Sequence, residues 1–140
     1  MKRYVPIIAL DFDGVIHSYT SGWQGPRKIP DKPVDGVLGW IEAFCMDHCC
    51  PDSICAMAPA PTARLVIFSS RSRYPFARMC MKAWMVLHGF DRRFFEVIKF
   101  PLFKPPAHVT VDDRVVCFDG RMPDCEHLMG FNPWNKKEKP

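Results

Sequence analysis

Short apolar runs separated by polar residues mark the predicted strands of this chain. Four such runs, rich in β-branched side chains, lie at residues 4–10, 64–68, 108–111 and 115–118. Largely continuous apolar runs of this length are typical of parallel strands that are covered on both faces. A fifth segment, residues 94–100, is a further strand candidate.

Two longer segments between these runs carry the spacing of amphipathic helices. In residues 33–48 an apolar stripe at helical spacing consists of Val34, Leu38, Ile41 and Cys45. Residues 74–89 begin near Pro75 and end at Gly89, which are residues that favour a helix start and a helix stop. The alternation of strand and helix predicts an α/β fold with a doubly wound, mainly parallel sheet and helices on both faces.

Three segments fit neither pattern. Residues 16–33, rich in glycine, proline and aromatic side chains, predict a loop or hairpin flap beside the end of the first strand. Residues 49–63 predict a connector rich in proline and alanine. The tail is expected to pack through Phe131 and Trp134 and to fray over residues 135–140.

Length and composition favour one globular domain spanning residues 1–140. The formal net charge of +4 suits phosphorylated or nucleic-acid partners. No apolar stretch is long enough to span a membrane and the start is not that of a signal peptide, so we expect a cytoplasmic protein. The seven scattered cysteines favour reduced thiols over a disulfide framework, and the cluster from Cys45 to Cys55 lacks the paired knuckles of a zinc site.

Polar and charged side chains follow several of the predicted strands. Because ligands bind outside the carboxyl ends of parallel strands, we expect these side chains to converge in one crevice. Clustered carboxylates need a cation, and oxygen ligands suit Mg²⁺. A cation, a lysine and hydroxyl groups together form a cradle for a phosphoryl group. The set consists of Asp11, Asp13, Ser69, Ser70, Arg71, Lys104, Asp112, Asp113 and Arg114.

Four short motifs in this order resemble those of the haloacid dehalogenase-like phosphohydrolases. They are DFDGV at residues 11–15, IFSS at residues 67–70, Lys104, and VTVDD at residues 109–113. The resemblance covers about 100 residues, and it implies a Rossmann-like core. Receiver domains of two-component signalling fit less well, because their acid pair comes first and a lone aspartate later.

The resemblance also implies a role for each matching residue. Asp11 would be the nucleophile that forms an aspartyl-phosphate, and Asp13 would donate and accept protons, a role that requires a raised pKa. Ser69, or its neighbour Ser70, would bind the phosphoryl oxygens, and Lys104 would neutralise them. The metal would be held by Asp11, by Asp13 through its carbonyl, and by Asp112 and Asp113.

Other residues beside the crevice have two interpretations each. Arg71 either contacts the substrate phosphate or pairs with Asp113. His17, Tyr19 and Trp23 either stack on a nucleobase or fasten the flap to the body. Arg114 is expected to be structural.

The spacing of the motifs leaves no room for the cap domains that family members insert, and such minimal members resemble phosphatases of large substrates. We therefore expect a Mg²⁺-dependent phosphomonoesterase, a hydrolase acting on a nucleotide or a nucleic-acid end. The alternative is a non-catalytic module of the same fold that binds nucleic acid or a partner protein.

Overall fold

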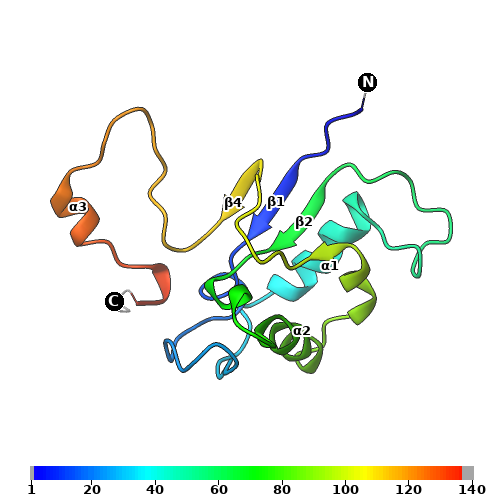
Figure 1. The fold of residues 1–140 in the computed structure, drawn as a ribbon, viewed down its shortest axis with the longest axis horizontal. Helices are drawn as coiled ribbons and strands as arrows, with labels where there is room; N and C mark the ends of the chain where they lie inside the picture. Colours follow the sequence, from blue (N-terminus) through cyan, green and yellow to red (C-terminus); the bar gives the residue numbers. More distant parts are fainter. Residues whose placement is uncertain (1, 137–140) are drawn as a thin grey trace.

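The computed structural model describes residues 2–136, and a four-stranded parallel sheet lies at its centre (Figure 1). The strand order is β3-β2-β1-β4. The strands are β1 (Ile7–Leu10), β2 (Arg64–Ile67), β3 (Ile98–Lys99) and β4 (Val109–Val111). Both neighbours of β1 run parallel to it, so the predicted parallel sheet of an α/β fold is confirmed.

The two predicted helices form, each starting later than its apolar pattern. They are α1 (Val37–His48) and α2 (Ala77–Leu87), and a short α3 (Cys125–Met129) follows β4. Gly36 and Phe76, directly before α1 and α2, have φ angles of +76° and +63°. A left-handed residue cannot continue a right-handed helix, and it sets the first residue of each helix. Three 3₁₀ segments complete the structure: Ser70–Arg73, Arg92–Glu96 and Trp134–Lys136.

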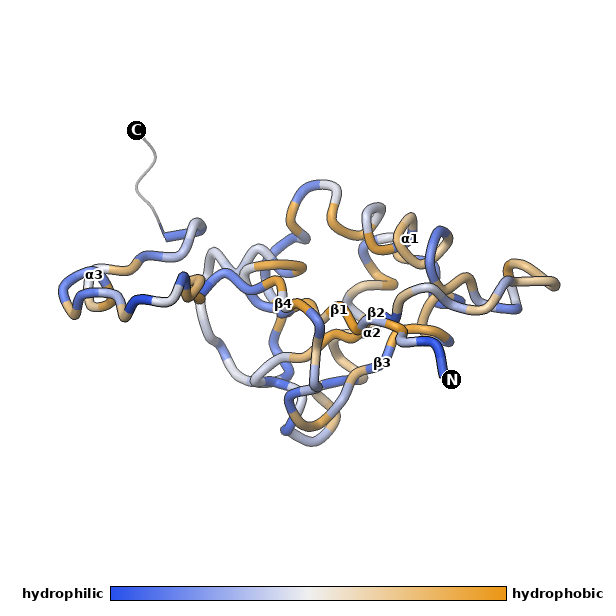
Figure 2. The backbone as a smooth tube through the Cα atoms, turned by 90° about the horizontal axis from the view of Figure 1, so that it is seen from above, coloured by the Kyte–Doolittle hydropathy of each residue, from blue (hydrophilic) through white to orange (hydrophobic). Residues whose placement is uncertain are grey.

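Side chains from alternate strand positions build the hydrophobic core with both longer helices. The strands contribute Leu10, Leu65, Ile67 and Ile98, and the helices contribute Ile41, Cys45, Met81 and Met85. Ala9 and Val66 point to the other face because successive strand residues alternate, and they are buried outside this cluster. In Figure 2 the hydrophobic stretches of β1 and β2 lie at the centre of the molecule.

Two expected strands differ from the structure. Residues 94–100 supply only the two residues of β3, after a 3₁₀ turn. Residues 115–118 form no strand, and Val115 and Phe118 are 57% and 65% exposed. A parallel strand needs a crossover of a dozen or more residues, whereas three residues separate this run from β4. The chain instead leaves the body in an arm that carries α3 (Figure 1).

The flap and the tail are tied together near the end of β1. Within the flap, the Ser18 amide donates to the Lys32 carbonyl at 3.0 Å. From the tail, Trp134 Nε1 donates to the Gly14 carbonyl at 2.7 Å, and Asn135 Nδ2 donates to the Ser18 carbonyl at 3.0 Å. The rest of the tail expected to fray, residues 137–140, lies outside the described residues. No helix within residues 2–136 is long and apolar enough to cross a membrane.

Candidate functional site

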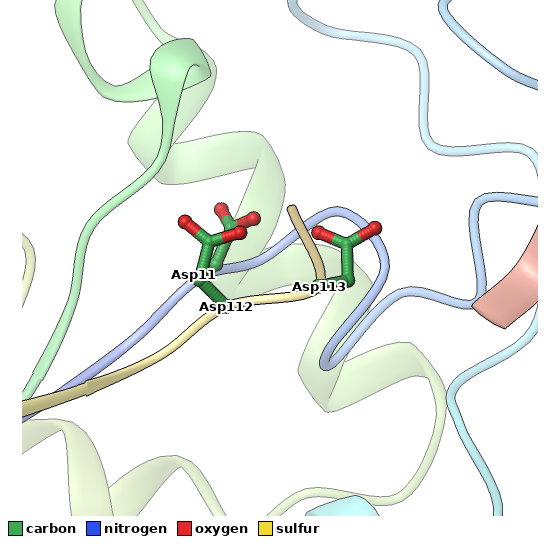
Figure 3. Close-up of side chains that lie close together, drawn as sticks. All are labelled: Asp11, Asp112 and Asp113. Carbon is green, nitrogen blue, oxygen red and sulfur yellow. The ribbon is translucent and has the colours of Figure 1, made fainter. Parts of the chain in front are cut away.

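Three carboxylates meet at the carboxyl ends of β1 and β4. Leu10 is in register with Val111, and the Asp11 amide donates to the Val111 carbonyl at 2.9 Å. The residues that follow these two strands therefore lie side by side. Carboxylate oxygens of Asp11, Asp112 and Asp113 lie within 4.8 Å of one another (Figure 3). We call these three residues the acid cluster.

The side chain of Asp113 is enclosed within the acid cluster. Its side chain is 2% exposed, and among the described residues neither carboxylate oxygen has a hydrogen-bond partner. Arg114 Nε lies 3.9 Å from Oδ2, beyond hydrogen-bond distance. Burying a charged carboxylate without a partner is costly. A positive charge close to this carboxylate would offset that cost.

Burial and repulsion from neighbouring carboxylates disfavour the charged forms of Asp11 and Asp113. Burial, followed by the nearby Asp112 carboxylate, raises the pKa of Asp11 to about 8. Burial also raises the pKa of Asp113, and Asp112 adds to the effect. A divalent cation would reverse both effects, and an all-oxygen donor set suits a hard cation. The residues present thus fit a metal site of this class.

Asp13 lies outside the acid cluster because its carboxylate is turned toward other partners. Oδ1 is 2.9 Å from His17 Nδ1, and Oδ2 accepts from Arg71 Nε at 2.7 Å. Burial raises the pKa of Asp13, but the hydrogen bonds from His17 and Arg71 outweigh it and the net pKa is lowered. The raised pKa expected from the sequence is therefore corrected.

The polar residues after β2 differ in their burial and in their hydrogen bonds. Ser69 is buried, and its Oγ accepts from the Arg71 amide at 3.2 Å. Ser70 is exposed at the start of the 3₁₀ turn. Arg71 is fully buried and pairs with Asp13 rather than with Asp113. Of the two serines, only Ser69 is held rigidly by the turn it caps.

Arg71 also reaches across to the flap. Its Nη1 donates to the carbonyls of Gly25 and Lys28, both at 2.8 Å, and to that of Pro26 at 3.2 Å. The guanidinium carbon lies 4.8 Å from the centroid of the Trp23 ring. The buried guanidinium group of Arg71 thus joins the turn after β2 to the flap.

The flap side chains His17 and Trp23 differ in their burial. His17 is fully buried, with Asp13 on one ring nitrogen and the Asp31 amide on the other. These contacts favour the interpretation that His17 fastens the flap. Trp23 packs over Arg71 but is 47% exposed, so part of its ring is available to a ligand.

Lys104 is exposed, and within residues 2–136 its ammonium forms no ion pair with a carboxylate. No contact within 4.0 Å therefore joins this ammonium group to a carboxylate of the acid cluster in the described part of the chain. The cysteines between Cys45 and Cys55 are free thiols. Among the described side chains, the acid cluster is the one group of three metal-ligating residues.

Two contacts of the site were not expected from the sequence. Asp31 positions His17 through its backbone amide, and no local pattern signals this contact. Gly14 lies against Asp113, and a side-chain carbon at this glycine would overlap that carboxylate. A glycine directly after DFD could have indicated that another group approaches the backbone closely at this position.

No family model, curated protein or solved structure matches this chain.

Proposed function

We propose that the chain is a Mg²⁺-dependent phosphomonoesterase of the haloacid dehalogenase-like type, with a doubly wound core and no cap domain. The observation that carries the proposal is the acid cluster, in which both oxygens of Asp113 are buried without a partner in the part of the chain that the structure describes. The sheet supports it, because the parallel strands β1 and β4 bring the DFDGV and VTVDD motifs to one edge.

In this proposal Asp11 attacks the phosphorus atom. Asp11 Oδ1 accepts from the Phe12 amide at 2.8 Å, which leaves Oδ2 for the attack. A bond forms between Oδ2 and phosphorus while the bond from phosphorus to the leaving oxygen breaks, and the leaving oxygen takes up a proton from solvent. Water then attacks the aspartyl-phosphate, phosphate departs and the Asp11 carboxylate is restored.

The other residues bind the phosphoryl group or move protons. The Ser69 hydroxyl keeps its hydrogen to donate, because its oxygen accepts from the Arg71 amide. The two donors on Asp13 favour removal of a proton from the attacking water over protonation of the leaving group. A Mg²⁺ ion held by Asp11, Asp112 and Asp113 would supply positive charge that offsets the charge of the phosphoryl oxygens.

A nucleotide or a nucleic-acid end is the proposed substrate, in the cytoplasm. The positive net charge and the half-exposed ring of Trp23 support it. The second candidate is a non-catalytic module that binds nucleic acid or a partner protein through the same fold. One observation favours this module: the Lys104 side chain is exposed and, within residues 2–136, has no ion pair with a carboxylate of the acid cluster.

A panel of phosphomonoesters tests the proposal. We expect hydrolysis with Mg²⁺, loss of activity in EDTA and recovery when Mg²⁺ returns. The protein should stay folded in EDTA, because a Mg²⁺ site of this kind adds little folding energy. Asp11→Asn should lower kcat by several orders of magnitude, and Asp47→Asn, on the exposed side of α1, should not. Mg²⁺ binding without any hydrolysis would favour the binding module, and a tenth of the activity left in Asp11→Asn would exclude the covalent role.

A further inference from the structure

Two fully buried side chains from different parts of the chain hold the Asp13 carboxylate. Arg71 comes from the 3₁₀ turn after β2, and His17 comes from the start of the flap. Asp13 Oδ2 lies 2.7 Å from Arg71 Nε, and Asp13 Oδ1 lies 2.9 Å from His17 Nδ1. The direction of this carboxylate is therefore set by two other side chains.

The partners of His17 define which of its nitrogens carries the hydrogen. The backbone amide of Asp31 can only donate, and it points to Nε2 at 3.1 Å. Asp31 Oδ2 also lies 3.4 Å from Nε2. In the neutral ring that accepts at Nε2 and in the doubly protonated ring alike, Nδ1 carries the hydrogen that is donated to the Asp13 carboxylate. The ring is also confined between Phe12, at a centroid distance of 6.0 Å, and Trp84, at 5.5 Å. The donor on Asp13 consequently has one fixed direction.

Arg71 connects Asp13 to the flap through a single planar group. Its Nε binds Asp13 while its Nη1 binds the carbonyls of Gly25, Pro26 and Lys28. Arginine offers these donors in a rigid fork, whereas lysine has one nitrogen and cannot reach both sets of acceptors in the same way. Movement of the flap would remove acceptors from the group that orients Asp13.

We infer that Arg71 and His17 are positioning residues that set the direction of the Asp13 carboxylate and make it depend on the contacts between Arg71 and the flap. The catalytic consequence rests on the proposed phosphatase function. The link between Asp13 and the flap rests on the contacts alone.

The kinetic test uses conservative variants with p-nitrophenyl phosphate as the probe. Arg71→Lys keeps the charge but loses the fork, and it should lower kcat by at least about tenfold with little change in KM, because a misplaced catalytic group slows the reaction step. Arg73→Lys, an exposed neighbour that contacts Tyr74, is the matched control and should leave both constants unchanged. Equal kcat values for these two variants would overturn the inference.

His17 provides a second pair of variants in case Arg71→Lys does not fold. His17→Asn can place an amide donor near the position of Nδ1, whereas His17→Gln places its amide near the position of Nε2 and leaves no donor near that of Nδ1. We expect His17→Asn to keep more of the wild-type kcat than His17→Gln at the same KM. The opposite order, or equal values, would contradict a positioning role for Nδ1.

Hydrogen exchange tests the link without any activity. Arg71→Lys and Asp13→Asn should both speed exchange of the Ser18 and Val34 amides, which close the flap, and leave the amides of β2 unchanged. An Asp13→Asn protein with wild-type exchange in the flap would overturn the link. If the wild-type protein hydrolyses no phosphomonoester, the proposed function fails, and the exchange result alone decides whether the link exists.

Discussion

The Asp113 carboxylate lies directly against the α-carbon of Gly14. A side-chain carbon at residue 14 would overlap this carboxylate, and Gly14 has a φ angle of +86°. The glycine of the DFDG motif thus has two structural effects. It allows the turn after β1, and it leaves space for the carboxylate of Asp113. This contact links two motifs that are far apart in the sequence.

Gly14→Ala should therefore damage the metal site as well as the fold. We expect a loss of stability of about 1 kcal/mol or more from the positive φ angle, together with weaker Mg²⁺ binding from displacement of Asp113. Calorimetric titration with Mg²⁺ and thermal unfolding measure the two effects. Gly22→Ala is the matched control, because Gly22 has a φ of +72° and nothing within 4 Å of the added carbon. Equal Mg²⁺ affinities in the two variants would contradict the role of this contact.

The raised pKa of Asp11 predicts a pH dependence of stability in the absence of metal. Between the ordinary pKa of 3.8 and about 8, the folded protein keeps a proton on Asp11 that the unfolded chain has lost. The free energy of unfolding should therefore fall as the pH rises through this window. Urea unfolding in EDTA between pH 6 and about pH 9 measures the slope. Asp11→Asn should flatten it and Asp47→Asn should not, whereas an unchanged slope in Asp11→Asn would assign it to other groups.

Lys104→Gln separates the two candidate functions. If Lys104 neutralises phosphoryl oxygens when substrate is bound, kcat should fall by about 10²-fold, the usual cost of losing one stabilising donor. The melting temperature should stay within a few degrees, since the residue is exposed. Lys99→Gln, an exposed lysine on β3, serves as the control. Full activity in Lys104→Gln would remove this lysine from the proposed mechanism.

Trp23→Ala tests the proposed substrate class. Stacking of a base on an aromatic side chain is worth about 1–3 kcal/mol, so kcat/KM for a nucleotide should fall about tenfold or more. The value for p-nitrophenyl phosphate should change little, because this substrate has no base to stack. Trp40→Ala, an equally exposed tryptophan on α1, should affect neither. Equal losses on both substrates in Trp23→Ala would mean that Trp23 only fastens the flap over Arg71.

Local sequence was sufficient to predict β1, β2 and β4 and the edge at which the acids meet. The apolar runs that became β1, β2 and β4 are short and rich in β-branched side chains, and acids follow directly after β1 and β4. Parallel strands end at a common edge, so the convergence of Asp11 with Asp112 and Asp113 followed from the order of the elements. The apolar run at residues 115–118 looked similar, yet it forms no strand because it lies too close to β4 along the chain.

Hydrophobic patterning and turn residues act over a few neighbours. The sequence was therefore enough to predict where strands end and which residue types follow them. The tertiary structure alone decided which partners these side chains have. Asp13 and Arg71 are 58 residues apart, and their pairing depends on how the flap and the turn after β2 pack together. The same packing buries His17 and encloses Asp113 against Gly14. Burial and hydrogen-bond partners set the charge and direction of a carboxylate, and neither is encoded in the residues adjacent to it.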